Sequence, residues 1–265
     1  MVRPGLRWFF RVAAVLALIA GFLLFALATE TDRFFSWTIE PPLTAAFLGA
    51  AYWAACVLLT WAARQQRWAR ARSVLPPVFV IAVLLLAATL IRLDKFDLDS
   101  LFGWFWLGVY VVVPPLLVFL VVEQVRSAGP VRRGEIPLPA PARGILAAQG
   151  AVMVVLGAIL FVAPSTADEL WPWTLTPLTA EAVGAFLAGF GLAAAAALWE
   201  DDLDRLRGAA LAYAALGALE LAAVAIHSGD LTSSGLGTTL YVALWVSVMA
   251  TGAYGWIARS AASRS

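Results

Sequence analysis

Two residues with catalytic or proton-carrying chemistry lie close together in one apolar stretch. Glu220 stands among alanines and leucines, and His227, the only histidine, follows seven residues later. In a helix, seven residues make nearly two turns, so both side chains share a face, but the rise of about 10 Å excludes a direct hydrogen bond. A carboxylate within a membrane span marks a candidate site for a proton or a solute. The alternative is a structural hydrogen bond between helices, and the apolar neighbours of Glu220 at helical spacing favour it. These neighbours are Leu216, Gly217, Ala223 and Val224.

A second candidate is a loop that occurs twice. Residues 37–50 and 173–185 align with one skipped proline, and eight of 13 aligned positions are identical. The shared residues include Trp, Thr, Pro and Gly rather than Leu and Ala alone, which indicates an internal duplication at an offset near 136. The candidate site residues of the two copies are Trp37, Thr38, Pro41 and Thr44 in the first and Trp173, Thr174, Pro177 and Thr179 in the second.

Three interpretations of this loop remain open at the sequence level. Thr176 before Pro177 is typical of a helix start, with Thr as N-cap and Pro at the first helical position, and Pro41 fits similarly. The aromatic residues Trp37, Trp171, Trp173, Phe34 and Phe35 predict a belt at the membrane interface. Alternatively, two helix N-termini on one face could hold an anion or a lipid headgroup through their free N–H groups.

Other catalytic or metal-binding patterns are missing. With one His and one Cys, the chain cannot form a multi-histidine metal centre or a haem site with several histidine ligands. No phosphate-binding glycine loop and no G-x-S-x-G elbow occurs. The acidic run at 200–204 could suggest a divalent cation, but Arg205 and Arg207 follow at once and favour a salt-bridged segment. We therefore expect no metal, no cofactor and no enzymatic activity.

The composition shows where these residues must lie. Of the 265 residues, 62% are apolar and 13% are charged, and the net charge is +1. Soluble domains have about 45–50% apolar and about 25% charged residues. An ordinary water-soluble fold and a nucleic-acid-binding function are thus excluded, and membrane lipids are the expected surroundings.

Eight stretches have the length and apolar character of a membrane-spanning helix. They predict an all-α integral membrane protein with spans at about 8–28, 43–61, 74–91, 101–122, 144–163, 180–199, 206–226 and 238–256. A signal peptide is the competing interpretation of the first stretch. The duplication argues against it, because the same offset matches the first stretch to an internal span.

The basic residues predict the orientation of these spans. Fifteen of the 18 lie near the N-terminus, in or next to the second, fourth and sixth connections, or in the C-terminal tail, and the other three are Arg33, Arg92 and Lys95. Because cytoplasmic loops are enriched in Lys and Arg, we expect both termini in the cytoplasm. The Arg-rich, Ala-rich composition suggests a bacterial protein of the inner (plasma) membrane.

The duplication divides the chain into two four-helix membrane repeats, 1–128 and 143–265, joined by a Pro- and Arg-containing cytoplasmic linker at 129–142. An even number of spans per half makes the repeats parallel, related by an axis along the membrane normal. The W-x-L-T-P-L-T loop resembles one found in uncharacterised multi-pass membrane proteins of bacteria, especially actinobacteria. The resemblance implies the architecture but no activity.

We therefore expect a non-enzymatic membrane protein that packs with, senses or scaffolds a partner, which could be another membrane protein or a second copy of the chain. The alternative is a carrier or channel for a small solute or proton, with Glu220 in a water-filled cavity between the halves.

Overall fold

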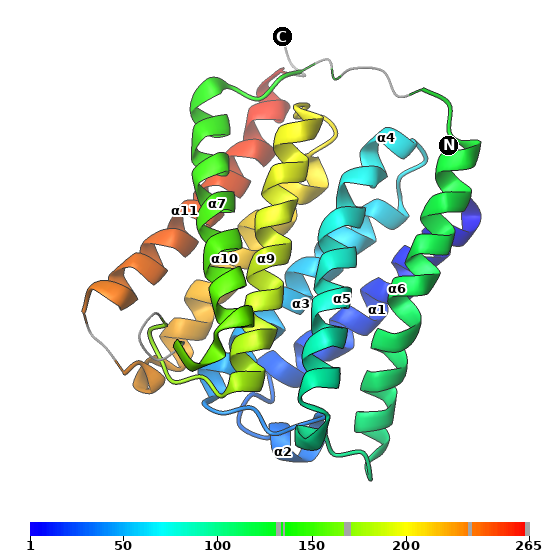
Figure 1. Cartoon of the computed structure of the whole chain (residues 1–265). Coiled ribbons are helices and arrows are strands. Elements are labelled where there is room, and N and C mark those ends of the chain that lie inside the picture. The colour runs from blue at the N-terminus through cyan, green and yellow to red at the C-terminus, as the bar shows by residue number, and fades with distance from the viewer. Residues whose placement is uncertain (131–133, 135, 167–170, 233–234, 263–265) are drawn as a thin grey trace.

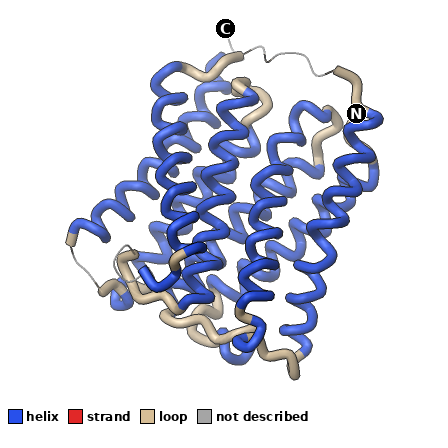
Figure 2. The backbone as a smooth tube through the Cα atoms, viewed as in Figure 1, coloured by secondary structure: helices blue, strands red, loops and turns tan. Residues whose placement is uncertain are grey.

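The computed structural model describes residues 1–130, 134, 136–166, 171–232 and 235–262, the last four (259–262) as backbone only. Within these residues the chain is helical, without strands (Figure 2). Eight helices are long and apolar enough to cross a membrane, which confirms the predicted number of spans in the described part of the chain. They are α1 (Pro4–Phe25), α3 (Pro42–Ala63), α5 (Leu75–Ile91), α6 (Leu101–Ser127), α7 (Ala140–Val162), α9 (Pro177–Glu200), α10 (Arg207–Ile226) and α11 (Leu236–Ala262).

Short helices connect the spans at both ends of the bundle. In the described residues, the spans are joined by two α-helical turns, α2 (Thr31–Phe34) and α4 (Trp68–Ala71), and by four 3-10 turns, η1 (Arg72–Val74), η2 (Leu93–Lys95), η3 (Pro164–Thr166) and η4 (Ser228–Asp230). Helix α4 and η1 lead directly into α5. Counted from the start of α4, at Trp68, this span begins earlier than the sequence predicts. Helix α6 runs without a break through Pro114 and Pro115.

The two ends of the bundle differ in character. Helix α1 begins and α11 ends at the same end (Figure 1), together with the arginines that precede α5 and α10. We call this the arginine-rich end. The two copies of the repeated loop lie at the opposite end, which we call the loop end. Arg132, Arg133 and Arg264, which contribute to the predicted charge asymmetry, lie outside the described residues.

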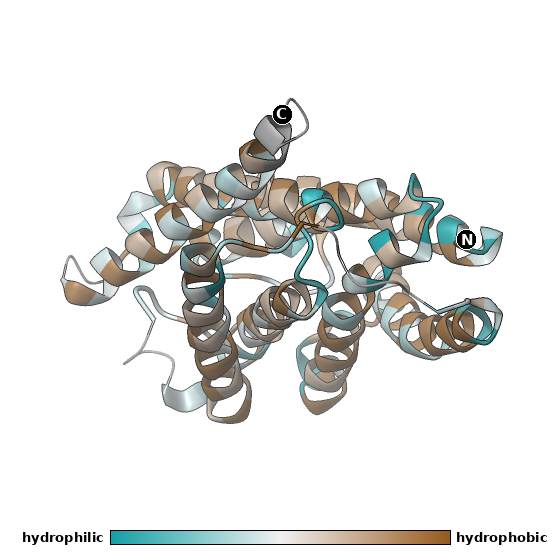
Figure 3. Cartoon of the chain, turned by 90° about the horizontal axis from the view of Figure 1, so that it is seen from above, coloured by the Kyte–Doolittle hydropathy of each residue, from teal (hydrophilic) through white to brown (hydrophobic). Residues whose placement is uncertain are grey.

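The spans pack in a pattern that crosses between the two parts of the chain. Helix α1 packs on α3 and α7 packs on α9, while α5 lies against α9 and α10 lies against α3. Helices α3 and α9 therefore form the middle of the bundle, and they are the most buried spans. Hydrophobic residues, brown in Figure 3, run along the helices, and many of the large ones are exposed. Exposed Phe119 and Val155 are examples.

Glycines allow the closest approaches between spans. A Cβ added at Gly184 of α9 would lie 2.7 Å from the Gly157 carbonyl oxygen of α7 and 2.9 Å from the Phe161 nitrogen. A Cβ added at Gly49 of α3 would lie 2.5 Å from the Phe25 nitrogen at the end of α1. Since lipid tails are as apolar as leucine, membrane helices associate through such close van der Waals packing rather than by escaping water.

Candidate functional site

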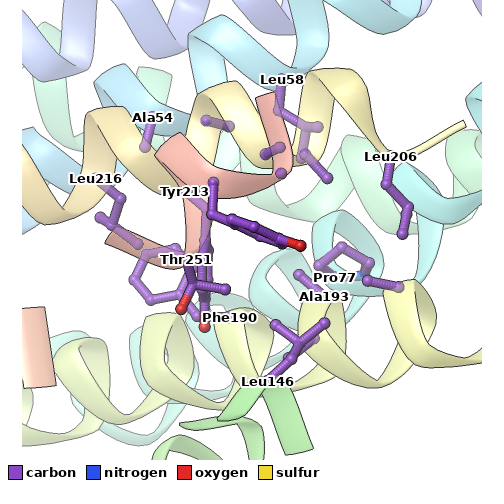
Figure 4. Close-up of a pocket in the computed structure, with 18 of the residues that line it drawn as sticks. Ala54, Leu58, Pro77, Leu146, Phe190, Ala193, Leu206, Tyr213, Leu216 and Thr251 are labelled. Carbon is purple, nitrogen blue, oxygen red and sulfur yellow. The ribbon is translucent and has the colours of Figure 1, made fainter. Parts of the chain in front are cut away.

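An apolar cavity lies inside the bundle, in the half nearer the arginine-rich end. Its volume is about 120 Å³, and six spans (α3, α5, α7, α9, α10 and α11) contribute to its wall. Figure 4 shows side chains converging on it from these helices. They include Ala54 and Leu58 of α3, Pro77 of α5, Leu146 of α7, Phe190 of α9 and Leu216 of α10.

The connections at the arginine-rich end close one side of this cavity. Leu138 precedes α7, and Leu203 and Leu206 precede α10, and all three line the cavity while lying buried. The cavity thus extends from the level of the connections to about the middle of the spans, where Leu216 and Phe190 lie. This is the depth that a hydrocarbon chain occupies in one leaflet of a bilayer.

Two polar side chains in the cavity wall, Tyr213 and Thr251, already have partners, and a third, Tyr254, is exposed. The Tyr213 hydroxyl donates to the Met153 sulfur over 3.7 Å. The Thr251 hydroxyl donates to the Ser247 carbonyl at 2.8 Å and accepts from the Gln149 amide at 3.0 Å. No charged residue is found among those that line the cavity. Its chemistry therefore suits an apolar occupant, because a polar one would have to lose its hydration without gaining partners.

Glu220 lies elsewhere, in an aromatic cluster toward the loop end. Its side chain is fully buried, and Oε2 accepts a hydrogen bond of 3.2 Å from the hydroxyl of Tyr241 on α11. Its other oxygen, Oε1, has no hydrogen-bond partner within the described part of the chain. The Tyr241 ring contacts the rings of Trp171, Trp173 and Trp245 at 5.2–5.8 Å between centroids. Glu220 is not among the residues that line the central cavity.

The structure does not bring His227 to Glu220. His227 caps the C-terminus of α10 and is partly exposed, and within the described residues no hydrogen bond joins the two side chains. Tyr241, which does bind Glu220, was not predicted as a site residue. Its only sequence signal is a tyrosine within a predicted span, which does not say which helix it faces.

The two copies of the repeated loop meet at the loop end. Thr38, Pro41 and Thr174 line one cavity of about 670 Å³. Next to it, Nε1 of Trp173 donates a 2.8 Å hydrogen bond to the Thr44 hydroxyl, so a loop residue of the second half is tied to the first turn of α3. These five predicted site residues are therefore brought together, whereas Trp37 packs in a separate aromatic cluster with Phe35, Phe96 and Trp106.

The prediction of an interfacial belt is wrong for most of the loop aromatics. Phe35, Trp37, Trp171 and Trp173 are all buried, and Trp173 is among the largest side chains without exposure. The loops fold back over the ends of the spans, so these rings fill the space between helices instead of lying at the lipid headgroups. A sequence pattern of aromatic residues near a span end does not distinguish these two arrangements.

The helix starts in these loops are already capped by protein groups. Thr176 is the N-cap of α9 with Pro177 as first helical residue, as predicted, and its hydroxyl accepts from the Thr179 N–H. In the first copy the helix begins one residue later than predicted, at Pro42, and Asp230 Oδ2 accepts from the Leu43 N–H at 2.9 Å.

Carboxylates also line the cavity between the loops. Asp32, Glu40 and Asp230 belong to its wall. Negative groups there, together with the capped N-termini, leave the anion-binding interpretation without support.

Ion pairs link α5 to α9 at both of its ends, and the sequence did not predict them. At the loop end, Arg92 Nη2 lies 2.8 Å from Oε1 of the buried Glu181. The hydrogen bond to Glu181 raises the pKa of the Arg92 guanidinium above its ordinary value. At the arginine-rich end, Arg72 pairs with the buried Glu200, which Arg205 also contacts at 3.0 Å.

The acidic run at 200–204 is thereby explained as a salt-bridged segment. Asp204 pairs with Arg70, and Asp201 with Arg143. Within the described residues, no group of three or more His, Cys, Asp or Glu side chains is arranged to hold a metal ion.

No family model, no curated protein and no solved structure matches the chain. Its function must therefore be inferred from its own geometry.

Proposed function

We propose that this chain is a non-enzymatic membrane protein that holds an apolar chain, such as the acyl tail of a membrane lipid, in its central cavity. The observation that carries the proposal is the cavity itself. It lies where the spans of the two halves meet, and most of its wall is made of alanine and aliphatic side chains. Binding of a lipid tail is a form of the sensing or scaffolding role expected from the sequence.

The surroundings of the cavity favour a lipid tail over other occupants. Membrane lipids are the most abundant apolar molecules at this depth, and the cavity wall offers no charge to a polar solute. Water would find few unsatisfied hydrogen-bonding groups, because Tyr213 and Thr251 are already bonded within the protein. Cavities with such walls stay dry and accept apolar guests.

Transport of a proton or small polar solute has weaker support. That alternative requires water around Glu220, but the carboxyl group is fully buried and accepts a hydrogen bond from the Tyr241 hydroxyl. An interhelical hydrogen bond between α10 and α11 accounts for the presence of Glu220.

Equivalent contacts support an internal duplication as part of this proposal. Gly49 approaches the Phe25 nitrogen in the first half, and Gly184 approaches the Phe161 nitrogen in the second. The two glycines are 135 residues apart and the two phenylalanines are 136 apart, which is the offset between the repeated loops.

The contacts between spans of different halves also support the duplication. The third span of each half (α5 or α10) packs on the second span of the other (α9 or α3). We propose two parallel four-helix repeats with the arginine-rich end in the cytoplasm of a bacterial cell.

Photo-crosslinking tests the proposed cavity occupant. The full chain is reconstituted in nanodiscs that contain a phospholipid with a diazirine near the end of one acyl chain. After irradiation, mass spectrometry locates the lipid adducts. We expect adducts on residues of the cavity wall, such as Tyr213, and their loss in Ala193→Phe, because the new ring fills the space beside Phe190.

A matched substitution on the outer surface is the control. Ala225 of α10 is exposed, so Ala225→Phe should leave the cavity adducts unchanged. Adducts confined to outward-facing residues would show that no lipid tail enters the cavity. Cavity adducts that persist in Ala193→Phe would also contradict the proposal, because the labelling would then not depend on the space inside the cavity.

A further inference from the structure

A second cavity lies at the arginine-rich end, between α1 and α3, and no part of the proposed function uses it. Its volume is about 550 Å³, and three of the residues that line it are Arg7, Arg11 and Arg64. Arg7 and Arg11 are one helical turn apart on α1, and Arg64 caps the C-terminus of the antiparallel α3. The three cations therefore meet at the mouth of one cleft.

These arginines have no internal counter-charge. Within the part of the chain that the structure describes, none of the three forms an ion pair, whereas Arg70, Arg72, Arg143 and Arg205 at the same end all do. The Nε atom of Arg7 is buried and has no hydrogen-bond partner there. A buried guanidinium N–H without an acceptor is costly, so the site is complete only with an oxygen acceptor in the cleft.

The part of the cleft farthest from the arginines is apolar. Below the arginines, α1 contributes Ala14, Val15 and Leu18 along the same stripe, and α3 contributes Cys56. At the deeper end, Nε1 of Trp53 donates a hydrogen bond to the Leu18 carbonyl at 3.2 Å, which joins the two helices. The cleft thus has a cationic mouth and an apolar deeper part, lined by Ala14, Val15, Leu18 and Cys56, which we call the stem. A phospholipid has the same order of parts, a charged headgroup followed by apolar acyl chains.

We propose that this cleft binds the phosphodiester headgroup of an anionic phospholipid, with one acyl chain along the stem. Basic pockets between membrane helices on the cytoplasmic side suit such headgroups. Arginine contributes paired N–H donors that match phosphate oxygens, and Thr60 and Gln66 in the wall add hydrogen-bonding groups. A soluble phosphate would satisfy the arginines but leave the stem unused, which favours the lipid. The proposal is independent of the central cavity, which lies elsewhere in the bundle.

Native mass spectrometry of the purified full chain tests the inference. The detergent-solubilised protein is titrated with phosphatidylglycerol or with phosphatidylcholine of the same acyl chains. We expect tighter binding of phosphatidylglycerol, and about 30-fold weaker binding in Arg7→Gln/Arg64→Gln, since each arginine contributes about fivefold. Arg7→Lys/Arg64→Lys retains the charges and should keep most of the affinity, which shows that the Gln pair loses charge rather than fold.

The control pair removes the same charge from the same end. Arg67 and Arg126 are exposed and do not line the cleft, so Arg67→Gln/Arg126→Gln should change the affinity less than twofold. Purified protein has no cell polarity, so an effect of the arginines on membrane insertion does not enter the measurement. Equal affinity for the two lipids, an equal loss in the control pair, or displacement of phosphatidylglycerol by millimolar inorganic phosphate would overturn the proposal; the last result would indicate a soluble phosphate ligand.

Discussion

Glu220 illustrates what a single polar residue does in a dry interior. Its buried carboxyl group accepts a hydrogen bond from the hydroxyl of Tyr241, whose ring contacts three tryptophan rings. The pair joins neighbouring helices α10 and α11, which otherwise contact each other through small residues such as Gly217 and Gly252. The hydrogen bond therefore sets how the two helices are rotated against each other.

We expect Tyr241→Phe to destabilise the protein by about 1–3 kcal/mol, because both oxygens of Glu220 are then buried without a donor. Thermal unfolding in detergent measures this loss. Replacing both partners, in Tyr241→Phe/Glu220→Leu, should recover much of it, since no polar group is then left unpaired. If Tyr241→Phe melts at the wild-type temperature, the hydrogen bond contributes nothing to stability.

The sequence predicted the presence of these residues better than their partners. Glu220 and its apolar neighbours indicate a buried hydrogen bond, which the contact with Tyr241 fits. The same sequence places Glu181 near the start of a span and Arg92 after another, but their pairing depends on α5 lying against α9. Helical periodicity predicts on which face of its helix a residue lies, but it does not identify the neighbouring helix. It therefore cannot predict side-chain pairs between helices.

At the scale of helices, ion pairs hold α5 against α9 at both ends of their contact. Glu181 lies 3% exposed at one end of the α5–α9 contact and Glu200 is fully buried at the other. At the contact between α10 and α3, the Leu43 N–H of α3 instead donates a hydrogen bond to the Asp230 carboxylate in η4, just after α10. Within the described residues, buried ion pairs thus join α5 to α9 but do not join α10 to α3.

Removing the cation of the loop-end pair should be costly. Arg92→Ala leaves Glu181 buried without its counter-charge, and we expect a loss of about 3 kcal/mol, at the low end for buried pairs because Arg92 is one-third exposed. Chemical denaturation in mixed micelles measures it. The exposed pair of Lys95 and Asp94 is the control, and Lys95→Ala should cost less than about 1 kcal/mol. Similar losses in the two variants would contradict the role given to the Arg92–Glu181 pair.

The close approach of α7 and α9 gives a steric prediction. Gly184→Val places new atoms against the backbone of α7, which cannot move aside as a flexible side chain would. We expect a loss of at least 1–3 kcal/mol from overpacking and reduced yield of folded protein in size-exclusion chromatography. Gly108 of α6 has open space around it, so Gly108→Val should leave the yield near the wild-type level. A normal yield of Gly184→Val would show that the helices can separate at little cost.

At the scale of the whole molecule, the number of spans could be predicted because composition and length decide it. Each span needs about 20 apolar residues, and all eight predicted stretches correspond to helices in the described chain. The cavities could not be predicted, since the central one draws residues from six spans and from connections far apart in the sequence. Burial of the loop tryptophans was missed for the same reason.

The proposed orientation predicts opposite labelling of the two ends. In a Cys56→Ala background, Thr38→Cys at the loop end and Arg67→Cys at the arginine-rich end both place an exposed thiol in a connection. A membrane-impermeant thiol reagent should label position 38 in intact spheroplasts and position 67 only in inverted vesicles. The reverse pattern would invert the topology, and labelling of both positions from one side would contradict the bundle as a membrane-spanning unit.

The packing of α5 on α9 and of α10 on α3 also has a consequence for how the protein is made. A ribosome releases α1 to α6 before α9 and α10 exist, so the faces of α5 and α3 that later contact them are at first open to lipid or to the insertion machinery. At about 5–20 residues per second, this exposure lasts of the order of ten seconds. During this time the first half exposes helix faces that are buried in the complete protein, and Arg72 and Arg92 lack their partners. If synthesis stalls in the linker, quality-control proteases can therefore degrade it. Two half-length chains produced in one cell should rescue each other for the same reason, and neither should accumulate alone.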